Sequence, residues 1–102
     1  IQTGTATSNG GGIYIGDCKT FDIIDTFVTR NTASGNGGGL YTNYISGTIN
    51  VEFVGRNPGQ FSDAFSGNAA TSGGGLYLTR GTLNLSNIAI ENNTATSSGW
   101  GI

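Results

Sequence analysis

The 102-residue chain offers few side chains for acid–base or metal chemistry. It contains no histidine, which is the residue that most often acts as a general base near neutral pH and a frequent ligand of zinc. The closest pair of acidic residues is Asp22 and Asp25. Two carboxylates can share general acid–base work, but their odd separation would place these two on opposite faces of a strand. We therefore predict solvated charges, with no catalytic residue, no metal site and no cofactor.

Two asparagines fit the acceptor pattern for N-linked carbohydrate. They are Asn84, in Asn84-Leu-Ser86, and Asn92, in Asn92-Asn-Thr94. Matches are expected by chance in a chain so rich in Asn, Ser and Thr. Asn84 alternates with two leucines, so it should face solvent, which makes it the better candidate.

Charge and cysteine content narrow the classes of function. The formal net charge is −2 with only four basic residues, which argues against nucleic-acid binding. No apolar run is long enough to span a membrane. The single cysteine, Cys18, cannot form an internal disulfide, and we expect an exposed, unpaired thiol in a turn.

The elements that position these residues are repeated along the chain. Four versions of one phrase begin at Ile1 (IQTGTA), Val28 (VTRNTA), Phe65 (FSGNAA) and Ile90 (IENNTA). Each is followed by a glycine group and an aliphatic residue. About 27 residues separate the first two of these aliphatics, then about 36 and about 26, which is the period range of solenoids and related arrays.

The repeat reads as short strands rather than helices. Nineteen glycines and many Ser, Thr and Asn residues disfavour helix, and the aliphatic residues alternate with a period of two. In the best-formed copy we expect strands at 75–79, 82–86 and 88–92, with turns at 80–81, near 87 and across 93–99. A repeat of about 26 residues is too short for a four-stranded propeller blade. Three strands per repeat therefore predict an all-β parallel β-helix of three to four coils. Residues 1–102 would form a single domain of this fold.

Stacked coils would bring equivalent residues into columns. Tyrosines directly follow the inward aliphatic residues along the strand, so they should point outward and form an outer column. The alanines should form a tight inward corner. Asparagines at one corner should form a hydrogen-bonded ladder, with Gly4 in that place in the first copy, because Asn and Gly accept a left-handed backbone. The predicted inward columns are Ile13, Leu40, Leu76 and Ile102; Ile15, Thr42 and Leu78; Ile1, Val28, Phe65 and Ile90; and Ala6, Ala33, Ala70 and Ala95. The predicted tyrosine column is Tyr14, Tyr41 and Tyr77, and the predicted ladder is Asn31, Asn68 and Asn93.

The long middle repeat contains an insertion at about residues 58–67. We expect it to bulge from the wall as a loop, and loops on rigid scaffolds often carry recognition. Phe61 and Asp63 are the residues that we expect to make contacts there.

The segment 65–77 (FSGNAATSGGGLY) resembles the paired F-x-x-N and G-G-x-[ILV] repeats of polymorphic outer-membrane proteins and related surface adhesins. The resemblance covers nearly the whole chain, although Val28 and Ile90 replace Phe and Trp100 interrupts the last glycine group. It implies a right-handed parallel β-helix of the pectin-lyase-like class. It also implies secretion, an extracellular or cell-surface location and adhesion.

Neither end of the repeat array shows a polar cap, which solenoids need for solubility. We therefore expect a processed subunit or part of a longer protein, and self-association through open β-helix ends. The prediction is a non-catalytic structural or adhesive surface element, either a self-stacking fibre subunit or a segment of a larger β-helical adhesin. Host or cell-surface carbohydrate is a candidate partner. The alternatives are a β-helix that binds or cleaves polysaccharide, and an ice-binding β-solenoid, suggested by Thr residues that flank the inward alanines.

Overall fold

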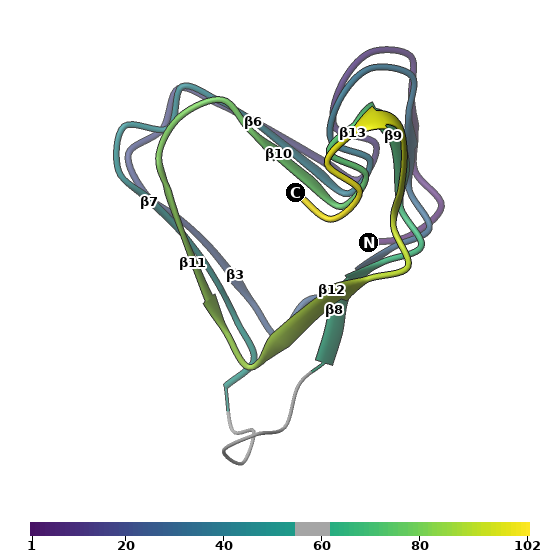
Figure 1. Ribbon diagram of the computed structural model, residues 1–102. Coiled ribbons are helices and arrows are strands. Elements are labelled where there is room, and N and C mark those ends of the chain that lie inside the picture. The colour runs from purple at the N-terminus through teal and green to yellow at the C-terminus, as the bar shows by residue number, and fades with distance from the viewer. Residues whose placement is uncertain (55–61) are drawn as a thin grey trace.

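The chain folds as a right-handed parallel β-helix. A computed structural model describes residues 1–54 and 62–102, and within them every paired strand is parallel and no helix occurs. The view along the axis shows the hand: the chain runs counterclockwise through β10, β11, β12 and β13 while the coils advance toward the viewer (Figure 1). The predicted fold class is therefore confirmed, including the hand that the family resemblance implied.

In the described residues, thirteen strands make up four faces of the wall, and each face is a parallel sheet that takes one strand from successive coils. Face I comprises β2 (Ile13–Gly16), β6 (Leu40–Asn43) and β10 (Leu76–Leu78). Face II comprises β3 (Phe21–Ile24), β7 (Thr48–Glu52) and β11 (Thr82–Ser86). Face III comprises β4 (Val28–Thr29), β8 (Ser62–Ser66) and β12 (Ile88–Glu91). Face IV comprises β1 (Thr5–Ala6), β5 (Thr32–Ala33), β9 (Ala69–Ser72) and β13 (Thr94–Ser98).

Face I has the register that the repeated glycine groups predict. Ile13 pairs with Leu40, and Leu40 pairs with Leu76, and both leucines are fully buried. Ile102 continues the column, because Leu76 N donates to Gly101 O as Leu40 N donates to Gly75 O in the coil before. Ile102 itself is 55% exposed. The column is thus dry in its centre and open at the coil that carries Ile102.

The remaining inward columns fill the interior. Phe65 pairs with Val28 on one side and with Ile90 on the other, as predicted for face III. On face II, Ile49 and Val51 are buried between the two neighbouring strands. The alternation of aliphatic and polar residues therefore produces one continuous core, to which burial of each large aliphatic side chain contributes about 1.5–3 kcal/mol. A threonine side chain interrupts it on face I.

That interruption is Thr42, which lies between Ile15 and Leu78 in the second column of face I. Its side chain is fully buried, and among the described residues its Oγ1 has no hydrogen-bond partner. A buried hydroxyl without a partner destabilises the fold.

Face IV corrects the predicted turn across residues 93–99. The three predicted strands of the best-formed copy are β10, β11 and β12, but residues 94–98 of the turn form a further short strand, β13. Its equivalents recur in every coil and give the narrow lobe beside face I (Figure 1). The inward residue of each strand is alanine, and Ala33, Ala70 and Ala95 are buried. A small side chain is what lets the wall fold back on itself here.

The corner before each ladder asparagine also differs from the prediction. The left-handed residue is the one that precedes the asparagine: Thr3, Arg30, Gly67 and Asn92 have φ of 58°, 56°, 65° and 55°. The asparagines themselves are therefore retained for their side-chain hydrogen bonds rather than for their backbone conformation. The glycine groups need bare backbone, since a Cβ on Gly38 would lie 2.5 Å from the carbonyl oxygens of Ala69 and Gly74.

The predicted insertion at 58–67 is shorter at its C-terminal side than expected. Residues 62–66 form β8, which pairs with β4 and β12 inside the wall. Phe61 lies outside the described residues, and so does the side chain of Asp63, whose backbone belongs to β8. The expectation that these two residues make contacts in a loop stays a prediction for Phe61, whereas Asp63 belongs to a strand.

Candidate functional site

The buried asparagines form a continuous ladder through the corner between faces III and IV. Asn31 and Asn68 are fully buried. The Asn31 backbone N and Nδ2 donate to Asn68 Oδ1 at 2.9 and 3.1 Å, and Asn68 N and Nδ2 donate to Asn93 Oδ1 at 2.9 and 3.0 Å. Each amide also ties its coil to the backbone of the preceding one: Asn68 Nδ2 donates to Val28 O at 2.8 Å and Asn93 Nδ2 to Phe65 O at 2.9 Å. Each step between asparagines therefore has three hydrogen bonds.

The first step of the ladder is different because Gly4 has no side chain. Gly4 N donates to Asn31 Oδ1 at 2.8 Å, and Asn31 Nδ2 donates to Ile1 O at 3.3 Å. Two bonds remain where the other steps have three. Gly4 cannot accept from a coil on its other side as an asparagine does.

The tyrosines form a stacked column on the outer surface of face I. Tyr14 and Tyr41 have ring centroids 5.1 Å apart at an interplanar angle of 28°, and Tyr41 and Tyr77 have centroids 5.6 Å apart at 13°. Burial raises the pKa of the Tyr41 hydroxyl, and its neighbours Tyr14 and Tyr77 raise it further. The ring faces of Tyr41 are covered by the other two rings, so this column is a structural element and not an open aromatic platform.

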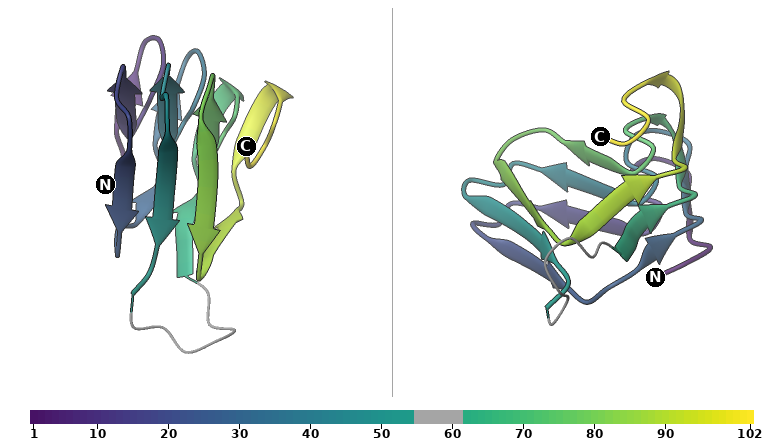
Figure 2. Two further views of the ribbon diagram at one scale, coloured as in Figure 1. Left: turned by 90° about the vertical axis from the view of Figure 1, so that its left-hand side faces the viewer. Right: turned by 60° about the horizontal axis from the view of Figure 1, so that its bottom comes forward.

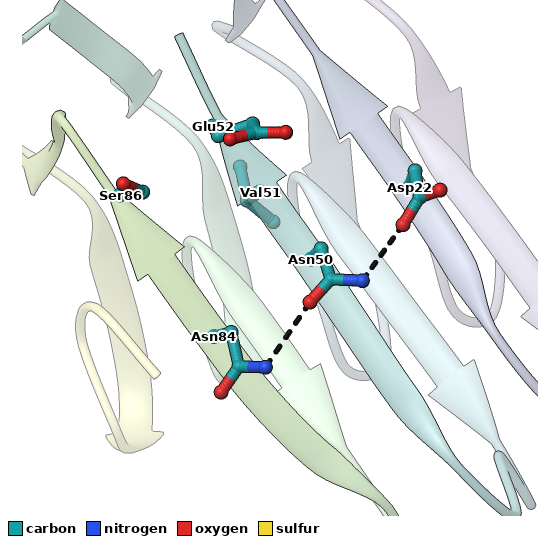
Figure 3. Close-up of a pocket in the computed structure, with 6 residues that line it drawn as sticks. All are labelled: Asp22, Asn50, Val51, Glu52, Asn84 and Ser86. Carbon is teal, nitrogen blue, oxygen red and sulfur yellow. Dashed lines mark hydrogen bonds between the residues drawn. The ribbon is translucent and has the colours of Figure 1, made fainter. Parts of the chain in front are cut away.

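A polar groove runs across the outer surface of face II and is the candidate binding site. Strands β3, β7 and β11 lie side by side there (Figure 2). Asp22, Asn50 and Asn84 occupy equivalent positions on the three strands and point outward (Figure 3). Asn84 Nδ2 donates to Asn50 Oδ1 at 3.1 Å, and Asn50 Nδ2 donates to Asp22 Oδ1 at 2.8 Å. The three side chains thus hold one another in place.

The groove has a volume of about 280 Å³, and Glu52 and Ser86 line it beside the row of amides. It presents carboxylate, amide and hydroxyl groups at the spacing of successive coils, about 4.8 Å. Such groups exchange hydrogen bonds with hydroxyl-rich ligands, and the two carboxylates disfavour anionic ones. The sequence carries a signal for this row, because a triplet of one polar residue between two apolar residues recurs at 21–23, 49–51 and 83–85.

The structure does not bring Asp22 and Asp25 together as a pair. Asp22 binds Asn50 in the groove, while Asp25 lies at a left-handed corner with φ 49° and its Oδ1 accepts from Val54 N at 2.8 Å. In residues 1–54 and 62–102, no group of three or more His, Cys, Asp or Glu side chains could hold a metal ion. No helix that could cross a membrane occurs in the described part of the chain either.

The other residues singled out from the sequence lie on the surface or near it. Asn84 is exposed on β11, and Asn92 is exposed at a left-handed corner with φ 55°. Whether either carries carbohydrate stays a prediction. Cys18 is a free thiol, but it is half-buried against the core rather than exposed, and its Sγ lies 3.7 Å from Thr20 O.

Hydroxyl side chains flank the alanines on the outer surface of face IV. Thr5, Thr32 and Thr94 are exposed there, and Ala69 interrupts their column. On the other side of the alanines, Thr71 Oγ1 donates to Ser34 O at 2.8 Å, so this hydroxyl is bonded to the backbone of the wall.

The two end coils expose apolar surface. At the first coil, a hollow of about 360 Å³ is lined mainly by aliphatic and aromatic side chains, among them Ile1, Ile13 and Phe21. At the last coil, Leu85 is 44% exposed and Trp100 is 69% exposed. Leu85 continues the column of the buried Val51, whereas Trp100 stands at the position that Gly38 and Gly74 occupy in the coils before it.

Residues 25–43 match the model of the Chlamydia polymorphic membrane protein (Chlamydia_PMP) repeat. This segment runs from the corner before β4 to the end of β6 and contains Asn31 and one complete glycine group. No curated protein and no solved structure matches the chain. The match confirms the repeat type expected from the sequence and associates it with membrane proteins of the bacterial surface.

Proposed function

We propose that the chain is a non-catalytic structural or adhesive element of a cell surface, and that its end coils bind further β-helical coils. Those coils belong to a second copy of the chain or to a longer adhesin. The repeat match at residues 25–43 supports the surface location, since that repeat is named for a membrane protein. The parallel β-helix supports a structural role, because its strands can add coils at either end.

The observation that carries the proposal is the contrast between inner and outer coils. Leu40 and Leu76 are fully buried, whereas Ile102 in the same column is 55% exposed. Leu85 is likewise exposed although its partner Val51 on the neighbouring strand is buried. A further coil would bury these side chains and pair the edge strands, which otherwise invite association.

The test is whether association requires the apolar end surface. We expect the purified chain to associate with concentration in sedimentation experiments, and native surface material to show fibres or elongated stalks by electron microscopy. Leu85→Asp should abolish association, because a carboxylate would be buried in the joint. Tyr44→Asp is the matched control, since Tyr44 is 60% exposed at a corner with φ 57°. Equal association of both variants, together with separate particles in native material, would refute the proposal.

A second candidate function is the binding of carbohydrate in the groove of face II. The observation that favours it is the hydrogen-bonded row of Asp22, Asn50 and Asn84 beside Glu52. Uncharged polysaccharides present hydroxyl groups that can replace water on these amides and carboxylates.

Binding to immobilised neutral polysaccharide tests this second function. We expect Asn50→Ala to weaken binding, because it removes the central amide, and Thr71→Ala on face IV to leave it unchanged. The same polysaccharides should remain uncleaved during the assay. Unchanged retention of the Asn50 variant would exclude the groove as the binding site.

A further inference from the structure

Three tyrosines on the outer surface of face I are held ring against ring by the register of the strands. Tyr14 on β2 pairs with Tyr41 on β6, and Tyr41 pairs with Tyr77 on β10, in both cases without a register shift. The ring centroids of Tyr14 and Tyr41 are 5.1 Å apart, and those of Tyr41 and Tyr77 are 5.6 Å apart. Stacking alone does not require the hydroxyl groups, because phenylalanine rings stack in the same way.

The phenol groups of this column are accessible to oxidants. Tyr14 is 56% exposed, and the side chains of Tyr41 and Tyr77 are half-buried. The chain has no methionine, and its one cysteine, Cys18, is half-buried against the core. Methionine and cysteine sulfur atoms are common targets of oxidation in proteins. The tyrosines therefore have few competitors for an oxidant, and Trp100, which is exposed, lies outside their column.

We propose that the column is a site of oxidative cross-linking, in which Tyr41 forms a dityrosine bond with a stacked neighbour. The oxidant is hydrogen peroxide acting through a haem peroxidase, which removes one electron at a time from phenols. The product is a covalent link between successive coils on the outside of the wall. Disulfide chemistry cannot supply such a link within residues 1–102, because they contain a single cysteine.

The reaction balances with that oxidant alone. Each of two phenols loses one electron and its hydroxyl proton and becomes a phenoxyl radical. The two radicals join through a bond between ring carbons adjacent to the hydroxyl groups, and the hydrogen on each of those carbons then moves to the phenol oxygen. Two tyrosines thus lose two electrons and two protons in total, and hydrogen peroxide takes them up to give two molecules of water.

The geometry favours Tyr14 and Tyr41 as the reacting pair. Their rings are the closer pair and are inclined by 28°, against 13° for Tyr41 and Tyr77, so one edge of the Tyr14 ring is tilted toward its neighbour. Tyr14 is also the exposed member, so its ring can turn without displacing core side chains. Tyr14 and Tyr77 lie two coils apart, about 10 Å at the spacing of strands in a sheet, and cannot couple directly. Tyr41 therefore takes part in either link.

The experiment treats the folded chain with hydrogen peroxide and a haem peroxidase at low protein concentration. Dityrosine fluorescence and mass spectrometry of the monomer measure the product, which is lighter than the untreated chain by two hydrogen atoms. Trypsin cuts after Lys19 and Arg30. A link between Tyr14 and Tyr41 therefore joins two peptides that otherwise separate. The test variant is Tyr41→Phe, which keeps the stacked ring, and the matched control is Tyr44→Phe, since Tyr44 is 60% exposed at a corner outside the column.

We expect Tyr41→Phe to lower the yield of intrachain dityrosine by at least about tenfold, because rings held in contact react at a much higher effective concentration than separate ones. Tyr44→Phe should leave the yield unchanged. The cross-linked chain should also unfold at a higher urea concentration than the untreated chain, since the new bond restricts the unfolded state. No intrachain product, equal yields from both variants, or an unchanged urea midpoint after cross-linking would overturn the proposal.

Discussion

Replacement of Asn68 by alanine should destabilise the chain more than any replacement at the ends of the ladder. Asn68 is fully buried, and its side chain accepts two hydrogen bonds from Asn31 and donates to Val28 O and Asn93 Oδ1. Asn68→Ala leaves the Asn31 backbone N without this acceptor and removes the bonds from Asn68 Nδ2 to Val28 O and to Asn93 Oδ1. Asn31 Nδ2 keeps its bond to Ile1 O, so its loss is partial.

The magnitude follows from one unpaired N–H and two lost hydrogen bonds. A buried polar group that loses its partner costs about 1–3 kcal/mol and each lost hydrogen bond about 0.5–1.5 kcal/mol, so we expect Asn68→Ala to lower the free energy of unfolding by about 2–6 kcal/mol. Domains of this size have total stabilities of about 5–15 kcal/mol, so the variant would be close to unfolding. Asn93→Ala removes the acceptor of Asn68 N and the donor to Phe65 O. Because Asn93 is only half-buried, water can replace part of these bonds, and the variant should cost about 1–2 kcal/mol.

Urea unfolding followed by the fluorescence of the single tryptophan measures both variants. The control is Thr71→Ala, since Thr71 is exposed and donates one hydrogen bond to the wall. We expect a change of less than about 1 kcal/mol for that control. A cost for Asn68→Ala no larger than that for Asn93→Ala would show that the ladder does not carry the stability assigned to it.

Three further predictions concern the columns and the tyrosines. Leu76→Ala should cost about 2–5 kcal/mol in urea unfolding because its side chain is fully buried, whereas Ile102→Ala should cost under about 1 kcal/mol, and similar costs would contradict the dry centre of that column. Thr42→Val should raise the free energy of unfolding by about 1 kcal/mol, since it removes a buried hydroxyl without a partner while keeping the shape; a loss of stability would show that the hydroxyl is satisfied. The pKa of Tyr41 is raised in the folded state, so the unfolded chain releases this proton first as pH rises past about 10, and stability should fall from there until the folded pKa is passed. Tyr41→Phe should remove that part of the decline in alkaline unfolding titrations, and an unaltered decline would contradict the assignment.

The column residues could be predicted from the sequence because a parallel stack places equivalent residues over one another. Ile13, Leu40 and Leu76 follow equivalent glycine groups, so their spacing alone fixed the register on face I. Face IV was harder to predict, because its strands consist of Thr, Ala and Ser, and this composition is equally typical of a corner. The left-handed position was misplaced by one residue because Asn and Gly favour that conformation wherever they occur, whereas here Arg30 adopts it.

The groove on face II was missed for a different reason. Proximity in sequence associates Asp22 with Asp25, whereas its hydrogen-bond partner Asn50 lies in the next coil. Contacts in a β-helix connect residues one coil apart, at separations that vary here between coils. The signal that aligns Asp22, Asn50 and Asn84 is a polar residue between two apolar neighbours in each coil.

At the junction between β7 and β8, the extra length of the middle repeat does not change the register in which the strands of neighbouring coils pair. The middle repeat is about ten residues longer than the others, yet β7 pairs with β3 and β11 on one side of the junction, and β8 pairs with β4 and β12 on the other. Strand pairing across coils, rather than the number of residues along the chain, therefore sets each level. A foreign peptide grafted at this joint would leave the layers in place, which makes the β-helix a rigid carrier with one variable site.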